Sequence, residues 1–391
     1  MPADDSSLFG PDNLPYGVFS VEGQDPRVGV RLGEEVIDLA RLFEDPRFDQ
    51  PSLNAFMASG YEAWVEVRRQ LQQRIADDAL PVEARFPLSE VRLHMPMEVA
   101  DYVDFYASEH HASNLGRLFR PDAEPLLPNW KHLPVGYHGR SGTVIVSGTD
   151  VRRPCGQRKA PDASEPTFGP SVRLDIEAEL GFVVGTGSRL GEQVSTADFE
   201  RHVFGCVLVN DWSARDIQAW EYVPLGPNLG KSFATSISAW VVPLLALTAA
   251  RCELPGQDPT PLPYLREEQS WGLDIALEVA WNGQVVSRPP YRTMYWSPAQ
   301  MLAHMTVNGA SARTGDLYAS GTISGPEKEQ RGAFIELTWG GEEPVTVNGE
   351  ERTFLVDGDE IAITASAPGA NGSRIGFGEV RGTIQPAPCE S

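Results

Sequence analysis

Glycine and proline interrupt this chain so often that its secondary structure must consist mostly of short segments. The 391 residues include 37 glycines and 32 prolines, and both residue types end helices and favour turns. Between them stand short runs rich in β-branched and aromatic residues, which favour strands. Hydrophobic residues make up 41% of the chain, which excludes a disordered protein. The sequence therefore predicts a mainly β protein, built as a sandwich, roll or barrel with few helices.

The length of the chain and a change in its composition predict two domains. Residues 1–95 read as a small β-rich domain, with a linker from 77 to 92, and residues 96–391 as a larger β domain. Helical spacing of apolar residues predicts a helix at about 61–76, and Ser297-Pro298 predicts the start of another that extends to about 305. Strands are expected at 16–21, 27–32, 36–39, 143–147, 172–184, 205–210, 239–243, 272–287, 333–339, 344–348, 353–356 and 360–365.

The net charge of −22 argues against nucleic acid and anionic membrane surfaces as partners, because both repel an acidic protein. It favours cations as ligands, or a small anionic substrate held in a locally basic pocket. The longest apolar stretch, 237–250, is too short to span a bilayer and contains Pro243. The first ten residues have neither the basic nor the apolar region of a secretory signal. We therefore expect a soluble, cytoplasmic protein without a membrane segment.

The cysteines at positions 155, 206, 252 and 389 are far apart and form no CxxC pair. This spacing argues against a disulfide framework and against a zinc-thiolate site. We therefore expect free thiols, as in proteins of the reducing cytosol.

Alternating acidic and apolar residues, Asp175-Ile-Glu177-Ala-Glu179-Leu180, form the strongest local signal. Successive strand residues point to opposite faces, so Asp175, Glu177 and Glu179 would share one face. Two carboxylates about 4 Å apart repel by ~4 kcal/mol at an effective dielectric of about 20. A Ca²⁺ or Mg²⁺ ion would remove that repulsion, since both ions bind oxygen ligands. The alternative is an acidic strand edge that faces solvent.

The segment 210–222, NDWSARDIQAWEY, predicts a helix that begins after Ser213. Ser213 and Asp216 have the spacing of a capping box, and Asp211 lies just before the helix. The helix would present three hydrogen-bonding side chains on one face: Arg215, Gln218 and Tyr222. This composition is common in pockets. The alternative is a surface helix with ordinary polar residues.

The segment 101–120, DYVDFYASEHHASNLGRLFR, contains two adjacent histidines and several carboxylates. If the segment is helical, Asp104 and His111 lie seven residues apart on the same face, which favours an acid–base role. The tandem His110-His111 leaves the choice of histidine open. A transition-metal cluster with Glu109 is an alternative, although the HExxH spacing is absent.

The segment 224–238 ends a loop with Gly230-Lys231-Ser232, which resembles the end of a phosphate-binding loop. The full pattern requires glycine at position 225, which is leucine, so the nucleotide interpretation fails. Lys231 is then either a cation in a functional loop or a solvated lysine. Residues 320–325, SGTISG, form a small-residue loop that either lets a ligand approach the backbone or is an ordinary flexible turn.

Taken together, these segments resemble the fumarylacetoacetate hydrolase family. The resemblance runs from about residue 101 to 360 and is carried by long motifs: DYVDFYASEHHASN, LLPNWKHLPVGYHGR, VSGTDVRRPCGQ, LDIEAELGFVVG, NDWSARDIQAWEYVPLGPNLGKSF, ISAWVVPLLAL, YASGTISG and FLVDGDE. It implies a small N-terminal SH3-like barrel, a C-terminal β-sandwich roll and a homodimer. It also implies hydrolysis of the carbon–carbon bond of 4-fumarylacetoacetate to fumarate and acetoacetate, the last step of tyrosine and phenylalanine breakdown.

The resemblance assigns roles to individual residues, and Asp175 matches none of the family's ligands. It implies a Ca²⁺ site made of carboxylates: Asp104, Glu177, Glu179 and Asp211. It selects His111 as the general base, oriented by Glu336. It implies groups that stabilise the departing carbanion: Arg215, Gln218 and Lys231. It implies contacts to the diketo-acid substrate: Tyr106, Arg120, Tyr137, Tyr222 and Thr322. A second, structural Mg²⁺ would lie near Lys231 and Thr235.

Three other functions are alternatives to this one. An acylpyruvate hydrolase or a decarboxylase of the same superfamily is opposed by the extended N-terminal region and by the block from DWSARDIQ to GKSF. A non-catalytic, calcium-stabilised β binding module would need only the carboxylates, and His111, Arg215 and Lys231 would be dispensable. A mononuclear iron oxygenase would use two histidines and a carboxylate and would consume oxygen.

Overall fold

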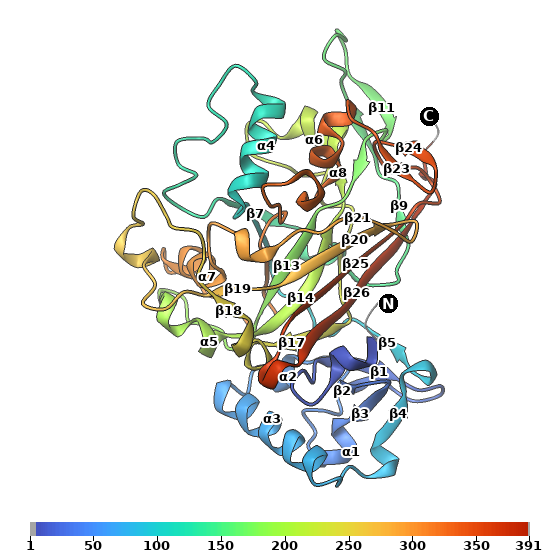
Figure 1. Ribbon diagram of the computed structural model, residues 1–391, viewed down its shortest axis with the longest axis vertical. Helices are drawn as coiled ribbons and strands as arrows, with labels where there is room; N and C mark the ends of the chain where they lie inside the picture. The colour runs from blue at the N-terminus through green and yellow to red at the C-terminus, as the bar shows by residue number, and fades with distance from the viewer. Residues whose placement is uncertain (1–4, 390–391) are drawn as a thin grey trace.

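The structure is a computed structural model that describes residues 5–389. A small N-terminal part lies against the end of a larger β body (Figure 1). The N-terminal part contains five strands and three helices: β1 (Tyr16–Ser20), β2 (Arg27–Leu32), β3 (Glu35–Asp38), β4 (Arg85–Pro87), β5 (Arg92–Leu93), α1 (Leu39–Phe43), α2 (Asn54–Met57) and α3 (Tyr61–Ala76). The predicted mainly β architecture is confirmed. The SH3-like form of the first domain and a boundary at residues 95 and 96 stay predictions.

One extended sheet connects the two parts. Its main path runs β4-β3-β2-β1-β17-β14-β13-β22-β6-β7, and β1 joins the body by pairing antiparallel with β17. Antiparallel neighbours β13 and β14 form its centre, and β22 connects β13 to β6. The strands of this sheet in the body are β6 (Tyr102–Phe105), β7 (Gly136–Gly139), β8 (Val144–Val146), β13 (Ala178–Val184), β14 (Val203–Asp211), β16 (Thr235–Ile237), β17 (Trp240–Pro243) and β22 (Leu317–Ala319).

A second sheet covers one face of the central strands. Its order is β21-β20-β25-β26-β9, with bounds β9 (Val151–Arg152), β20 (Ala276–Trp281), β21 (Gln284–Ser287), β25 (Glu360–Pro368) and β26 (Arg374–Gln385). Phe182 and Leu208 belong to the hydrophobic core shared with this sheet, whereas Val183 and Val207 belong to a core shared with the N-terminal part. Both faces of β13 and β14 are therefore buried, because alternate residues enter different cores.

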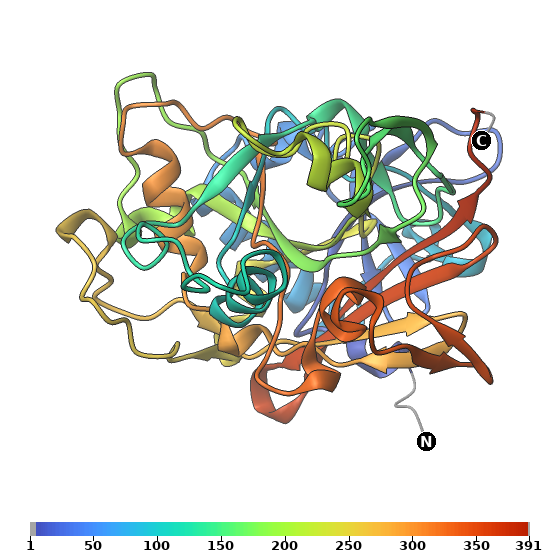
Figure 2. The same cartoon turned by 90° about the horizontal axis from the view of Figure 1, so that it is seen from above.

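Short ladders and helices complete the body. The ladders are β10 (Cys155–Arg158) with β11 (Thr167–Pro170), β12 (Leu174–Asp175) with β15 (Ser213–Ala214), β18 (Arg251–Cys252) with β19 (Gly272–Leu273), and β23 (Val345–Val347) with β24 (Glu350–Arg352). The helices are α4 (Glu109–Phe119), α5 (Phe199–His202), α6 (Arg215–Glu221), α7 (Pro298–Thr306) and α8 (Phe334–Leu337). Figures 1 and 2 show α4, α6 and α8 gathered at one end of the body, where β13 begins and β14 ends. Within residues 5–389, no helix is both long and apolar enough to cross a membrane.

Several predicted elements are confirmed. The helix expected at 61–76 is α3, which buries Trp64 and Leu71 against the N-terminal core. The helix after Ser297 is α7, and its first turn carries a capping box between Ser297 and Gln300. Predicted strands near 205–210 and 360–365 are β14 and β25, each a few residues longer than expected.

Other predicted elements are wrong. The linker at 77–92 contains β4 and the start of β5, which pair with β3 and β1, and Phe86 packs on the small core around Phe19. The strand expected at 333–339 is α8, and no strand forms at 353–356 because the hairpin closes earlier, with β24. The strand expected at 272–287 is divided among β19, β20 and β21. A turn at Asn282-Gly283, where both residues have positive φ, causes the division after β20.

The expectation of free thiols is wrong for two of the four cysteines. Cys155 and Cys389 form a disulfide, with 6.4 Å between their Cα atoms, while Cys206 and Cys252 are free. β26 runs parallel to β9, with Gln385 opposite Arg152. The segments that follow the two strands therefore lie side by side, which brings Cys155 and Cys389 together. A separation of 234 residues concealed this pairing from the sequence pattern.

Candidate metal centre and active site

Four carboxylates gather where the central strands meet at the end of the body. They are Asp104, Glu177, Glu179 and Asp211, all buried, and one oxygen atom from each lies within 4.8 Å of the others. β13 and β14 are antiparallel, so the start of one, near Glu179, lies beside the end of the other, at Asp211. β22 pairs with both β13 and β6, and its residue Ala319 lies opposite Asp104. Strand pairing therefore brings together residues that are far apart in the sequence.

These carboxylates fit a divalent cation. Oδ1 of Asp104 and both carboxylate oxygens of Glu179 are buried and have no hydrogen-bond partner within the described part of the chain. Burial, and then the neighbouring carboxylates, raise the pKa of Asp104 and of Glu179 well above the usual value, and burial raises the pKa of Asp211. Buried acceptors left without donors are costly. A hard cation takes oxygen ligands of this kind and would replace the missing partners.

Lys231 is buried between two of the carboxylates, so the solvated-lysine interpretation is wrong. Its Nζ lies 2.7 Å from Glu177 Oε2 and 2.7 Å from Asp211 Oδ2. Burial alone would lower the pKa of Lys231, but Asp211 and Glu177 raise it, so the amine stays charged. Burial would likewise raise the pKa of Glu177, but Lys231 and Arg215 hold it below its usual value. One carboxylate of the cluster is therefore neutralised by the protein itself.

The Lys231 side chain does not fit as a ligand of a second cation, whereas the Thr235 hydroxyl does. A charged ammonium group has no lone pair for a metal. Thr235 Oγ1 donates to Asp211 Oδ1 over 3.1 Å, which leaves the lone pairs of the hydroxyl oxygen for a cation. A structural Mg²⁺ near these residues would be held by this oxygen or by other groups, such as backbone carbonyls, and it stays a prediction.

The raised pKa values predict how cation binding depends on pH. Protons on Asp104, Glu179 and Asp211 must leave before an ion binds, so the affinity for Ca²⁺ should fall as the pH falls. A carboxyl group whose pKa is raised by folding stabilises the metal-free protein fully at pH values below its ordinary pKa of about 4. This stabilisation is lost as the pH rises through the raised pKa. The rise in melting temperature caused by a fixed Ca²⁺ concentration should therefore be larger at pH 8 than at pH 5. An equal rise at both pH values would contradict the account.

His111 and Glu336 form a buried pair beside the acidic cluster. His111 Nδ1 lies 2.6 Å from Glu336 Oε2, and the histidine is only 2% exposed. Asn114 Nδ2 and Ser324 Oγ each donate to Glu336 over 2.9 Å. Burial alone would raise the pKa of Glu336, but His111 and these hydrogen bonds lower it, so the carboxylate stays ionised and accepts the Nδ1 hydrogen. This leaves Nε2 of His111 free to take a proton.

Of the two adjacent histidines, His111 is the one that pairs with Glu336, but the helical reasoning that related it to Asp104 is wrong. Asp104 lies on β6, and only from Glu109 does the chain form α4, which Ser108 caps by accepting from the His111 backbone N–H. Asp104 and His111 therefore belong to different elements, and helical periodicity does not relate them. His111 is also close enough to Glu177 to lower the pKa of that carboxyl.

Arg215 and Gln218 lie together on α6, but the predicted capping box is wrong. The helix begins at Arg215 without a side-chain cap, because Ser213 belongs to β15 and its Oγ donates to the Asp211 carbonyl. Arg215 Nη1 lies 2.7 Å from Glu177 Oε1 and donates to Gln218 Oε1 over 3.2 Å. Its Nη2 atom is buried without a partner within residues 5–389, so it offers a donor to a ligand.

The remaining predicted residues surround this centre to different degrees. Tyr137 donates from its hydroxyl to Asp211 Oδ2 over 3.1 Å. The ring of Tyr106 meets that of His111 edge to face, with 5.2 Å between centroids. Arg120 ends α4 and donates to the Pro125 carbonyl. Tyr222 follows the last residue of α6 and is 45% exposed, so it faces solvent.

The small-residue loop at 320–325 is part of the wall of the site, so its interpretation as a flexible turn is wrong. Ser320 and Ile323 donate from their backbone N–H groups to Leu180 and Ala178 of β13. Thr322 is 1% exposed, and its hydroxyl has no partner in the described part of the chain. Asn114 and Ser324 were missed in the sequence. Only the helical spacing of three residues between His111 and Asn114 could have indicated the first.

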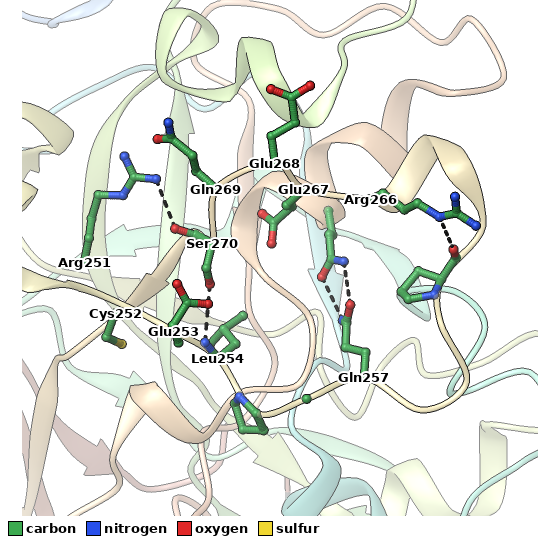
Figure 3. A pocket seen from close by; sticks show the side chains of 14 residues that line it. Arg251, Cys252, Glu253, Leu254, Gln257, Arg266, Glu267, Glu268, Gln269 and Ser270 are labelled. Carbon is green, nitrogen blue, oxygen red and sulfur yellow. Dashed lines mark hydrogen bonds between the residues drawn. The ribbon is translucent and has the colours of Figure 1, made fainter.

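Two cavities differ in their relation to this centre. One of about 350 Å³ lies beside Asp211 and Lys231, and Tyr137, His138 and Arg140 also line it. A larger one, of about 850 Å³, lies between residues 251–257 and 266–270 and contains no member of the acidic cluster (Figure 3). Its side chains bond to one another, as the paired amides of Gln257 and Gln300 show. The smaller cavity is therefore the one connected to the candidate site.

Comparison with known proteins gives matches along nearly the whole chain. The family model described as fumarylacetoacetate (FAA) hydrolase C-terminal matches residues 101–385, and that described as fumarylacetoacetase N-terminal matches residues 12–96. The fumarylacetoacetase of Homo sapiens is 47% identical over 99% of this chain and 98% of its own length. That of Arabidopsis thaliana is 45% identical over 98% of this chain and 97% of its own length.

Solved structures share the fold at much lower identity. Fumarylacetoacetate hydrolase from psychrophilic Exiguobacterium antarcticum is 18% identical, with a TM-score of 0.59, over 95% of this chain and 99% of its own. Maleylpyruvate hydrolase from a Sphingobium species, solved with manganese(II) and pyruvate, is 15% identical, with a TM-score of 0.55, over 96% of this chain and 100% of its own. These structures support the fold alone.

Proposed function

The chain belongs to the fumarylacetoacetate hydrolase family, and from this premise we propose that it hydrolyses 4-fumarylacetoacetate to fumarate and acetoacetate. One observation carries the proposal: a buried histidine–glutamate pair lies beside a cluster of four buried carboxylates. The near full-length identity to fumarylacetoacetases supports the choice of substrate. In this role the enzyme would complete tyrosine and phenylalanine breakdown.

Hydrolysis of a β-diketone needs an activated water molecule, a polarised carbonyl group and a stabilised carbanion. His111 would take a proton from water at Nε2 while Glu336 holds its Nδ1 hydrogen, and such a base contributes ~10²–10⁴-fold. Arg215, Gln218 and Lys231 would face the carbon that leaves with the bonding electrons. Their fixed charges and donors lie in a buried site, where they stabilise developing negative charge strongly.

A cation held by Asp104, Glu177, Glu179 and Asp211 would supply Lewis-acid polarisation of substrate oxygens. We propose Ca²⁺ for this site, with Mg²⁺ as the alternative, because both prefer carboxylate oxygens. The protein's own contribution is to hold the carboxylates together in a buried place, where the ion is their best available partner.

Substrate recognition would depend on groups around the centre. Arg120 would bind a substrate carboxylate, since its guanidinium can donate two parallel hydrogen bonds. The further contacts would be Tyr106, Tyr137, Tyr222 and Thr322. Of these, the orphaned Thr322 hydroxyl offers a buried hydrogen-bonding group that a bound ligand would satisfy. We propose that the enzyme acts as a homodimer in the cytoplasm.

The choice of substrate is tested by comparing kcat/KM for fumarylacetoacetate with that for a short acylpyruvate on the same purified protein. We expect a preference for fumarylacetoacetate of at least ~10²-fold, because a site built to pair polar groups discriminates against substrates that leave them unpaired. A preference for the acylpyruvate would replace this proposal with that of a related diketo-acid hydrolase. No hydrolysis of either compound, with Ca²⁺ bound, would favour the calcium-stabilised binding module.

A further inference from the structure

Asp175 is the one acidic residue of the predicted strand 172–184 that the proposed function does not use. The alternation of the sequence predicted that it shares a face with Glu177 and Glu179. Asp175 does contact the same Arg215 guanidinium as Glu177, but it is outside the acidic cluster, and the strand is interrupted between β12 and β13. The residue is nonetheless fully buried, with 0% exposure. Because burying a carboxylate without partners is very costly, its contacts indicate why it is there.

All four contacts of the Asp175 carboxylate are short and specific. Oδ1 accepts from the backbone N–H groups of Ile176 and Phe334, each over 2.7 Å. Oδ2 accepts from the backbone N–H of Ile335 over 3.0 Å and from Arg215 Nε over 2.8 Å. Each oxygen thus has two donors, which satisfies the lone pairs of an ionised carboxylate. The side chain has no capacity left for a metal or a substrate.

These contacts connect the helix that carries Arg215 with the helix that carries Glu336. Phe334 and Ile335 begin α8, the short helix that carries Glu336, the partner of His111. Arg215 begins α6 and also pairs with Glu177. α8 has only four residues and no side-chain cap from its N-cap residue Ala333. A helix this short has little stability of its own, so outside contacts must hold it. Figure 1 shows α6 and α8 together at the same end of the body.

We propose that Asp175 is a positioning residue that fixes Arg215 and the Glu336 helix relative to each other. The proposal rests on the proposed function, because it takes Arg215 and Glu336 as members of the reacting site. The Asp175 carboxylate would fix the position of Arg215, which stabilises the carbanion, and of Glu336, which orients the base. Displacement of either by about 1 Å can cost ~10²-fold in rate.

Asp175→Asn tests this proposal, with Asp216→Asn as its matched control. Asp216 is the next residue after Arg215, its side chain is 10% exposed, and it accepts from Ser171 Oγ and the Val172 N–H, outside the site. We expect Asp175→Asn to lower kcat ~10²-fold, with KM changed less than about threefold and Ca²⁺ binding retained. Asp216→Asn should keep kcat near that of the wild type. Equal kcat values for the two variants would overturn the proposal.

Two further measurements separate positioning from a structural role. If Asp175 acts partly through Arg215, the variant Asp175→Asn/Arg215→Met should lose less kcat than the product of the single losses. A full product would overturn the proposal. If Asp175→Asn fails to fold, Asp175→Glu keeps the charge and moves the carboxylate by one methylene group. It should bind Ca²⁺ and turn over at least ~10-fold more slowly, and wild-type turnover would overturn the proposal.

Failure of the proposed function would be recognised separately. If the wild-type protein does not hydrolyse fumarylacetoacetate, the reaction assignment fails, and kinetics no longer test Asp175. A crystal structure of Asp175→Asn then decides. The proposal expects the Arg215 guanidinium or the Glu336 carboxylate to shift from its place in the wild-type protein, whereas unchanged positions of both would overturn it.

Discussion

His111→Ala should lower kcat by about 10²–10⁴-fold while the protein still binds Ca²⁺, because the side chain removed is the proposed base and not a ligand of the cation. The imidazole ring contacts Glu336 and Tyr106 and lies beside the acidic cluster without belonging to it. Steady-state kinetics and calorimetric Ca²⁺ titration of the same preparation measure the two properties separately.

The neighbouring histidine supplies the control for this experiment. His110 is half-buried on the same turn of α4, and His110→Ala removes the same chemical group one residue away. We expect turnover within about threefold of the wild type, as for a substitution that touches no reacting group. If His110→Ala were the inactive variant and His111→Ala were active, the assignment of the base would be wrong.

Glu179→Gln should have two effects of opposite sign. It removes a direct cation ligand, so Ca²⁺ affinity and turnover should fall by more than about 100-fold, since even partners of the ligands contribute 10–100-fold. The metal-free protein should nevertheless become more stable than the wild type. The substitution removes a carboxyl group that, in the metal-free protein, must either take up a proton on folding or lie unpaired among other carboxylates. Thermal unfolding in chelator and in Ca²⁺ measures both effects.

Glu177→Gln provides the contrast within the same cluster. Glu177 pairs with Arg215 and with Lys231, so its neutralisation leaves two buried cations short of a partner. The metal-free melting temperature should therefore fall for Glu177→Gln and rise for Glu179→Gln. A fall for both variants would contradict the view that Glu179 is held in place only for the cation.

The fold and the family were predictable because their signals are local or extend over long motifs. The helix at 61–76 follows from the spacing of Trp64 and Leu71, and the start of α7 from Ser297-Pro298. The acidic cluster was predicted in part from the alternation of Glu177 and Glu179. Strand alternation alone could not show that Asp175 lies outside this cluster, because an interruption of the strand between β12 and β13 is invisible to a pattern of period two.

What the sequence pattern missed depends on contacts between distant segments. Asp175 meets Phe334, and Cys155 meets Cys389, only after the sheets have formed. The segment 333–339 reads as a strand because Phe334, Ile335 and Leu337 are apolar. It is helical because its apolar side chains pack into two different cores. In addition, the Asp175 carboxylate accepts hydrogen bonds from the backbone N–H groups of Phe334 and Ile335 in the first turn. Tertiary contacts override local propensity in short segments of this kind.

If hydrolysis at the carboxylate cluster depends on a cation, removal of the cation must stop the reaction and its return must restore it. Purified protein is incubated with fumarylacetoacetate in H₂¹⁸O, first after chelation and then with Ca²⁺ or Mg²⁺ restored, while loss of substrate absorbance and the masses of the products are followed. We expect no turnover after chelation and restored turnover with the cation. We also expect one ¹⁸O atom in the new carboxylate of fumarate, because water adds to the carbonyl carbon at the cleaved bond. Full activity in chelator, or fumarate without ¹⁸O, would contradict a cation-dependent hydrolysis.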